Sequence, residues 1–176
     1  MMKRFALLLT LVVTAFTWTT VRAQADKDQM IADWQRAKAY TKAYLDAMPE
    51  DGYTTVKPTP EMRTFAAQML HIADGNYFLI GSVTGKMGPL KGSAEKLIAP
   101  NKADVTKAVM DSYDYVINLL QTLTPEEMQQ KGKVEGAEIT ASVAFNKAFE
   151  HQTHHRGQTV AYLRLKGVTP PPEMLF

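Results

Sequence analysis

The chain has 176 residues, 45% of them hydrophobic and 22% charged, with 20 Lys and Arg against 18 Asp and Glu. These values are typical of one globular domain with its own core, and they exclude a disordered or collagen-like chain. Because the chain has no cysteine, disulfides, thiolate metal sites and a cysteine nucleophile are excluded as well.

Residues 1–25 have the pattern of a secretory signal peptide. Lys3 and Arg4 form a basic start, and an uncharged stretch of 14 residues follows at positions 5–18. This stretch is shorter than the roughly 20 apolar residues of a membrane span. We therefore expect cleavage rather than anchoring, and no stable membrane insertion afterwards.

Small residues at Ala23 and Ala25 allow cleavage after either one, and the mature domain is expected over residues 26–176. The protein is then exported, either periplasmic or secreted. The leader carries three basic residues and no acidic one, so the remaining chain has 17 basic against 18 acidic residues. With no basic surface indicated, we expect no nucleic-acid partner.

Beyond the leader the hydrophobic pattern is helical, and no segment has a convincing strand pattern. A first helix is predicted over residues 28–48, because apolar residues recur at three- and four-residue steps. A second helix is predicted to start at Thr59, as N-cap before Pro60, and to end near Val83. Its apolar positions are Phe65, Met69, Ile72 and Leu79.

Two further helices are predicted over residues 103–123 and 140–166. Pro125 is expected to close the third helix, and Gly167 to provide a left-handed cap for the last. One turn of helix is expected over residues 93–98, and polar connections elsewhere. Four helices of matched length, each with one apolar face, predict an all-α four-helix bundle, but connections this long do not determine the topology.

Histidines interrupt the predicted core stripe of the last helix. Stepping along its face gives Ala144, Ala148, His151, His155, Gln158, Tyr162 and Leu165. Two histidines four residues apart lie on one face of a helix and suit one metal ion. His71, in the middle of the second helix, could meet them at one level of the bundle. The alternative is that these are buried histidines hydrogen-bonded to a carbonyl or an acid.

His154 lies at the edge of this stripe, so a flanking role is expected for it rather than ligation. Asp74, one turn from His71, and Glu150 are candidates to support a metal-bound histidine, although both could simply face solvent. The His-Glu-x-x-His pattern of metalloproteases is absent because Gln152 replaces the glutamate, and no Glu-x-x-His motif indicates a di-iron centre.

The segment from Glu150 to Gln158, followed by Gly167 and a proline pair, resembles the C-terminal signature of the DinB (DinB/YfiT-like) family. Upstream, Phe65 and the Leu70-His-Ile-Ala segment also match this family, and the resemblance covers about residues 28–172. It implies a four-helix bundle with long crossover connections. It also implies a three-histidine metal site, whose ligands by position are His71, His151 and His155.

The resemblance leaves two classes of function open. Three imidazoles leave a position for water or substrate, the pattern of a catalytic site. Some relatives are thiol-dependent transferases, but an exported chain lies away from cytoplasmic thiols, and a hydrolase is the other enzymatic option. The alternative is a non-catalytic bundle with a structural, sensory or carried ion. Zinc is the expected ion, with nickel or iron as alternatives; the small-molecule substrate and the choice between monomer and homodimer stay open.

The leader predicts a shortened mature chain. Mass spectrometry of the protein from its native host should give an N-terminus at Gln24 or Asp26, because small residues precede both positions. Intact Met1 in a cytosolic fraction would contradict this prediction.

Overall fold

The computed structural model describes residues 2–176, with side chains from residue 24 onward. The leader predicted over residues 1–25 therefore lies almost wholly outside the side chains that are described. Within the described part of the chain, no helix combines the length and apolar character needed to cross a membrane.

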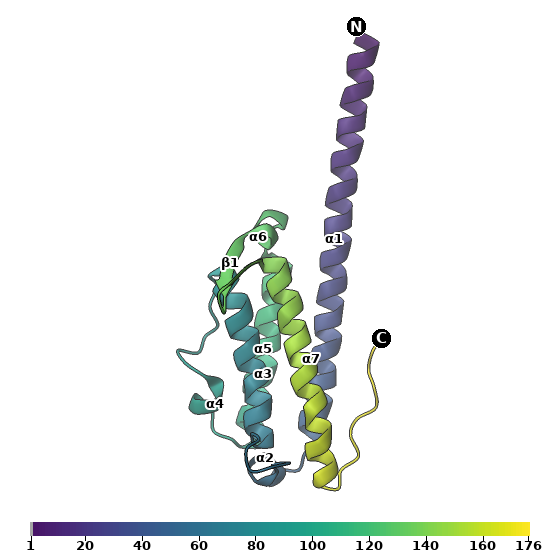
Figure 1. Ribbon diagram of the computed structural model, residues 1–176. Coiled ribbons are helices and arrows are strands. Elements are labelled where there is room, and N and C mark those ends of the chain that lie inside the picture. The colour runs from purple at the N-terminus through teal and green to yellow at the C-terminus, as the bar shows by residue number, and fades with distance from the viewer. Residues whose placement is uncertain (1) are drawn as a thin grey trace.

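Four long helices form a bundle, as the sequence predicts: α1 (Met2–Ala47), α3 (Phe65–Thr84), α5 (Lys102–Thr122) and α7 (Ala141–Leu165). Helix α3 packs against α5 and α7, and α1 packs against the same two helices from the far side (Figure 1). The consecutive helices α1 and α3 thus lie diagonally across the bundle. Helices α3 and α5 run parallel, and the connection over residues 85–101 returns along the bundle to join them.

Helix α1 has no start at the predicted residue 28, because neither glycine nor proline interrupts the chain before Pro49. The predicted start of the second helix at Thr59 is wrong. Instead Thr59 accepts a turn hydrogen bond from the Met62 amide at 3.1 Å, and the helix begins after Thr64, whose side chain accepts from the Ala67 amide. The chain around the prolines is therefore a turn, and the capping chemistry lies five residues further on.

The connections contain more structure than the sequence predicts. Short helices α2 (Gly52–Thr55) and α6 (Pro125–Gln129) are additional, whereas α4 (Ala94–Leu97) is the predicted single turn. The expectation of no strand is wrong, since β1 (Lys131–Val134) and β2 (Ala137–Thr140) form an antiparallel hairpin. Its two-residue turn has positive φ at Glu135 (49°) and Gly136 (85°), as tight hairpins require. Strands of four residues are too short for the sequence to show a clear alternation of apolar and polar side chains.

Of the apolar positions predicted for the second helix, Phe65, Met69 and Ile72 are buried and Leu79 is half-buried, but the stripe predicted for α7 is rotated. His151, His155 and Gln158 are only half-buried, and Leu165 is exposed. The fully buried face of α7 instead comprises Ala141, Ala144, Phe145, Ala148, Gln152, Arg156, Thr159, Tyr162 and Leu163. The histidines therefore lie at the rim of the core. Gly167 has φ 75°, which confirms the predicted left-handed end of α7.

The hairpin packs so closely on α3 that Gly132 has no room for a side chain. An added Cβ would lie 2.7 Å from the Val83 Cα and 3.1 Å from the Ser82 carbonyl oxygen. Gly132→Ala should therefore lower the free energy of unfolding by about 1–3 kcal/mol in urea denaturation. The matched control is Gly157→Ala in α7, where a Cβ meets nothing within 4 Å and stability should rise by up to about 1 kcal/mol. Equal effects of the two substitutions would contradict the packing argument.

Candidate metal centre

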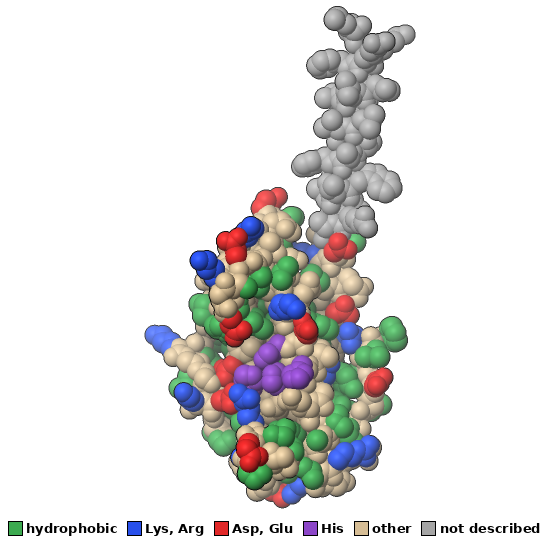
Figure 2. Space-filling model, in the orientation of Figure 1, with side chains coloured by type: hydrophobic (Ala, Val, Ile, Leu, Met, Phe, Trp, Pro, Cys, Tyr) green, Lys and Arg blue, Asp and Glu red, His purple; other side chains and the backbone are tan. Residues whose placement is uncertain are grey.

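Three histidines from two helices meet at the predicted site. His71 comes from α3, and His151 and His155 lie one turn apart on α7. One ring nitrogen from each lies within 4.8 Å of the others, and the ring centroids are 4.4 to 5.1 Å apart. Histidine side chains gather in the middle of one face of the molecule, where they are open to solvent (Figure 2). The fold thus brings together all three residues predicted as ligands.

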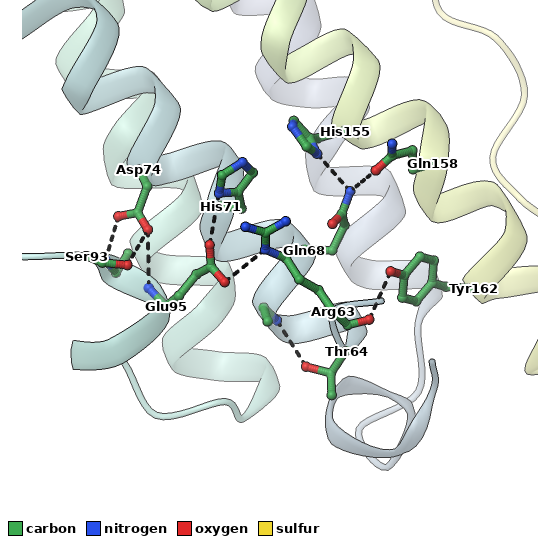
Figure 3. Close-up of polar contacts among 12 residues, drawn as sticks. Arg63, Thr64, Gln68, His71, Asp74, Ser93, Glu95, His155, Gln158 and Tyr162 are labelled. Carbon is green, nitrogen blue, oxygen red and sulfur yellow. Dashed lines mark hydrogen bonds and ion pairs between the residues drawn. The ribbon is translucent and has the colours of Figure 1, made fainter. Parts of the chain in front are cut away.

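A carboxylate that the sequence did not single out orients His71. The Nδ1 of His71 lies 2.9 Å from Oε1 of Glu95, and the Arg63 Nε donates to the other carboxylate oxygen at 3.0 Å (Figure 3). With Nδ1 engaged by an acid, Nε2 is the atom left to bind an ion. Glu95 lies on α4, and no local pattern marks a residue 24 positions away in an irregular connection.

Asp74, a candidate to support His71, instead holds α4 in place. Its carboxylate accepts from the Ser93 hydroxyl at 2.6 Å and from the Ala94 amide at 2.5 Å (Figure 3). The Ala94 amide is one of the backbone groups at the start of α4 that lack a partner within their own helix. Asp74 therefore acts on the site indirectly, because it fixes the helix that carries Glu95.

The two histidines of α7 are held differently from each other. The amide of Gln68 lies 2.9 Å from the Nδ1 of His155, which leaves Nε2 available. The Nδ1 of His151 is buried and has no hydrogen-bond partner among the described residues. The His151 ring packs directly against Gly75 of α3, where an added Cβ would overlap it. Glycine at this position thus makes room for one of the imidazoles.

Burial keeps the two histidines of α7 neutral. Desolvation, with smaller contributions from His71 and the Arg63 charge, lowers the pKa of His151 to about 4. Desolvation and the neighbouring histidines lower the pKa of His155 to about 3. Neutral imidazole is the form that binds metal. Together with the unpartnered nitrogen of His151, this makes the three residues a good fit for one divalent ion, and an all-nitrogen set suits zinc, nickel or iron.

His154 and Glu150 lie outside this cluster. The exposed His154 contacts Gln158, with 2.9 Å between Nε2 of the histidine and Nε2 of the amide. Glu150 is exposed and pairs with Lys147 at 2.8 Å. The expectation that His154 flanks the site agrees with this placement, whereas Glu150 makes no contact that would support a ligand.

Two of the three histidines open onto a cleft of about 750 Å³ between α3, the α4 segment and the hairpin. His71 and His151 line its floor. Its wall contains three further charged side chains near the start of α3 and α4, and a group of apolar side chains beyond the histidines. These lining residues are Arg63, Glu95 and Lys96 at the first end, and Phe78, Leu79, Met87 and Leu90 at the second.

Comparison with known proteins agrees with this architecture. The family model of the DinB superfamily matches residues 33–159. A DinB-like protein from Bacillus cereus is 19% identical, with a TM-score of 0.71 over 83% of this chain and 96% of its own. A DinB-like protein from Bacillus subtilis is 18% identical, with a TM-score of 0.66 over 83% of this chain and 96% of its own.

A third structure with the same fold is YfiT from Bacillus subtilis, described as a probable metal-dependent hydrolase with an unusual four-helix bundle topology. It is 18% identical, with a TM-score of 0.61 over 80% of this chain and 87% of its own. No curated protein sequence matches this chain.

The lowered pKa values predict that the metal-free fold loses stability in acid. The unfolded histidines titrate near 6.5, whereas His151 and His155 in the folded chain titrate at about 4 and about 3. Between these values the unfolded chain binds more protons, so the free energy of unfolding should fall as the pH decreases from about 6.5 toward about 3. Urea denaturation of metal-stripped protein at several pH values in this window measures the fall. A variant with both histidines changed to Gln should show a smaller fall in the free energy of unfolding. If this variant has the same pH dependence as the wild type, the prediction is contradicted.

Proposed function

The chain belongs to the DinB superfamily, and we propose that it is an exported, metal-dependent hydrolase that uses His71, His151 and His155 to bind one divalent ion, zinc by preference. The observation that carries the proposal is the position of the three histidines. His71 and His151 lie at the floor of an open cleft, with His155 beside them, and not beneath a closed apolar lid. A structural ion needs no access from solvent, whereas catalysis does.

The residues of the site have two functions: they hold the ion, and they leave it accessible to a molecule in the cleft. Neutral ligands add no negative charge, so the full positive charge of the ion faces the cleft. When bound, such an ion supplies Lewis acidity and lowers the pKa of a water in its open position. Glu95 keeps the proton of His71 on Nδ1, and both of its carboxylate oxygens are engaged. Glu95 is therefore an orienting group rather than a general base.

The description of YfiT as a probable metal-dependent hydrolase supports the hydrolytic option, because the two chains share the fold over most of their lengths. A thiol transferase would use the same histidines. Export, for which residues 1–25 are the support, would place the chain away from cytoplasmic thiols and favours hydrolysis. Water is then the only co-substrate that the reaction needs.

Changing one ligand tests the proposal against its alternatives. His155→Ala leaves two protein ligands and should abolish stoichiometric metal binding and any hydrolysis of a p-nitrophenyl ester, a loss of at least about 100-fold. His154→Ala, the matched control one residue away, should keep both. Elemental analysis of protein purified without added metal, together with the ester assay, gives the two measurements.

The outcomes separate the possible functions. Equal metal content in wild type and His155→Ala would show that these histidines are ordinary hydrogen-bonded residues. A different result is also possible, in which His155→Ala loses the metal but the metal-loaded wild type hydrolyses neither esters nor amides. This result would indicate a structural, sensory or carried ion.

A further inference from the structure

The cleft has two chemically different ends, and both can be located along α3. His71 lies in the first half of this helix, and Arg63 precedes its first turn. Phe78 lies seven residues beyond His71, about 10 Å further along the axis at the rise of an α-helix. An elongated molecule lying in the cleft would therefore contact the Arg63 end and the Phe78 end at once, with its middle over the histidines.

The end nearer the start of α3 is cationic. The Tyr162 hydroxyl donates to the Arg63 carbonyl at 2.9 Å, and Glu95 holds its guanidinium, so the position of Arg63 is determined from two sides. The side chain of Arg63 also lines the cleft beside His71 and His151. Lys96 adds a second cation to the wall of the cleft at this end.

The acids at this end are already used within the protein. The Glu95 carboxylate bonds to His71 and Arg63, and the Asp74 carboxylate bonds to the start of α4. Neither therefore presents a free carboxylate to the cleft. An incoming anion would meet Lys96, the guanidinium of Arg63, whose Nε is paired with Glu95, and the positive charge of a bound ion.

The other end is apolar and exposed. Phe78 is 47% exposed and Met87 is 66% exposed, and both line the cleft with Leu79 and Leu90. Large apolar side chains facing water in a cavity are typical of a surface that a ligand covers, and methionine adapts its shape readily. The carboxylate of Glu135, at the tip of the hairpin, also lines the cleft. Glu135 comes from the hairpin and not from the α4 segment. Its negative charge repels an anionic group, so a substrate with one charged end would not bind in the reversed orientation.

We infer that the substrates of this site are N-acylated amino acids or similar amides, with an apolar acyl group and a carboxylate on the other side of the scissile bond. The inference rests on the proposed function and specifies its substrate class. The acyl chain lies against Phe78 and Met87, and the carboxylate pairs with Lys96 and Arg63. The reaction adds water across the C–N bond, giving a fatty acid and a free amino acid, and it needs no other reactant.

Calorimetric titration of zinc-loaded protein with octanoylglycine, acetylglycine and octanamide tests the two ends separately. Each methylene that becomes buried raises affinity about fourfold, so octanoylglycine should bind at least about 30-fold more tightly than acetylglycine. Met87→Glu should remove most of this difference, because it places a charge in the apolar end. The matched control is Leu165→Glu, at an apolar residue that is also exposed, 62%, but lies outside the cleft.

Lys96→Glu tests the cationic end. This substitution should lower the affinity for octanoylglycine about tenfold and leave the affinity for the neutral octanamide unchanged. Lys42→Glu on α1 should change neither affinity. Equal binding of octanoylglycine and acetylglycine, no effect of Met87→Glu, or no effect of Lys96→Glu would each overturn the inference, as would the absence of binding by all three probes.

The failure of this inference is distinguishable from the failure of the proposed function. If the protein binds stoichiometric zinc and hydrolyses esters, but its affinity for the probes does not depend on the length of their acyl chain, only the substrate class is overturned. Loss of the zinc site itself, measured by elemental analysis before any titration, would remove the proposed function as well.

Discussion

The close approach of α3 to α7 is the constraint on which the site depends. Gly75 allows it, because any side chain there would overlap the ring of His151. Contact at this point brings His71 within reach of both histidines of α7, and it removes enough water to keep His151 and His155 neutral. One packing contact therefore determines both the geometry of the cluster and its protonation.

A buried polar network determines how α7 is rotated in this contact. Arg156 is almost fully buried, and its guanidinium donates to the side-chain oxygens of Gln152 at 2.7 Å and Thr41 at 3.3 Å. The guanidinium also lies 4.4 Å from the ring centre of Tyr40, and Tyr113 donates its hydroxyl to the same oxygen of Gln152. Because a buried cation must keep its partners, this face of α7 cannot turn outward. The neighbouring edge of the helix, with the histidines, is then left facing the cleft.

The crossed topology supplies the rest of the site. Because α3 and α5 run parallel, their connection must return the length of the bundle, and Glu95 within it contacts His71 on the way. Asp74 fixes this passage at the start of α4, which brings Glu95 to His71. The same connection contributes Met87, Leu90 and Lys96 to the cleft. A simple hairpin between the helices would leave His71 without its carboxylate and the histidines without a cleft.

The sequence by itself determined the features that depend on local geometry. Helical periodicity predicted the four long helices, the spacing of His151 and His155 placed both on one face, and the chemistry of Gly167 marked the end of α7. The position of His71 in the middle of the second helix made it a candidate partner, and the family resemblance implied that it is the third ligand. Tertiary structure alone decided the rotation of α7, because local periodicity cannot tell a satisfied buried Arg156 from an exposed one. It also decided the role of Glu95, since a carboxylate becomes a partner for histidine only when the folded chain brings together residues that are distant in sequence.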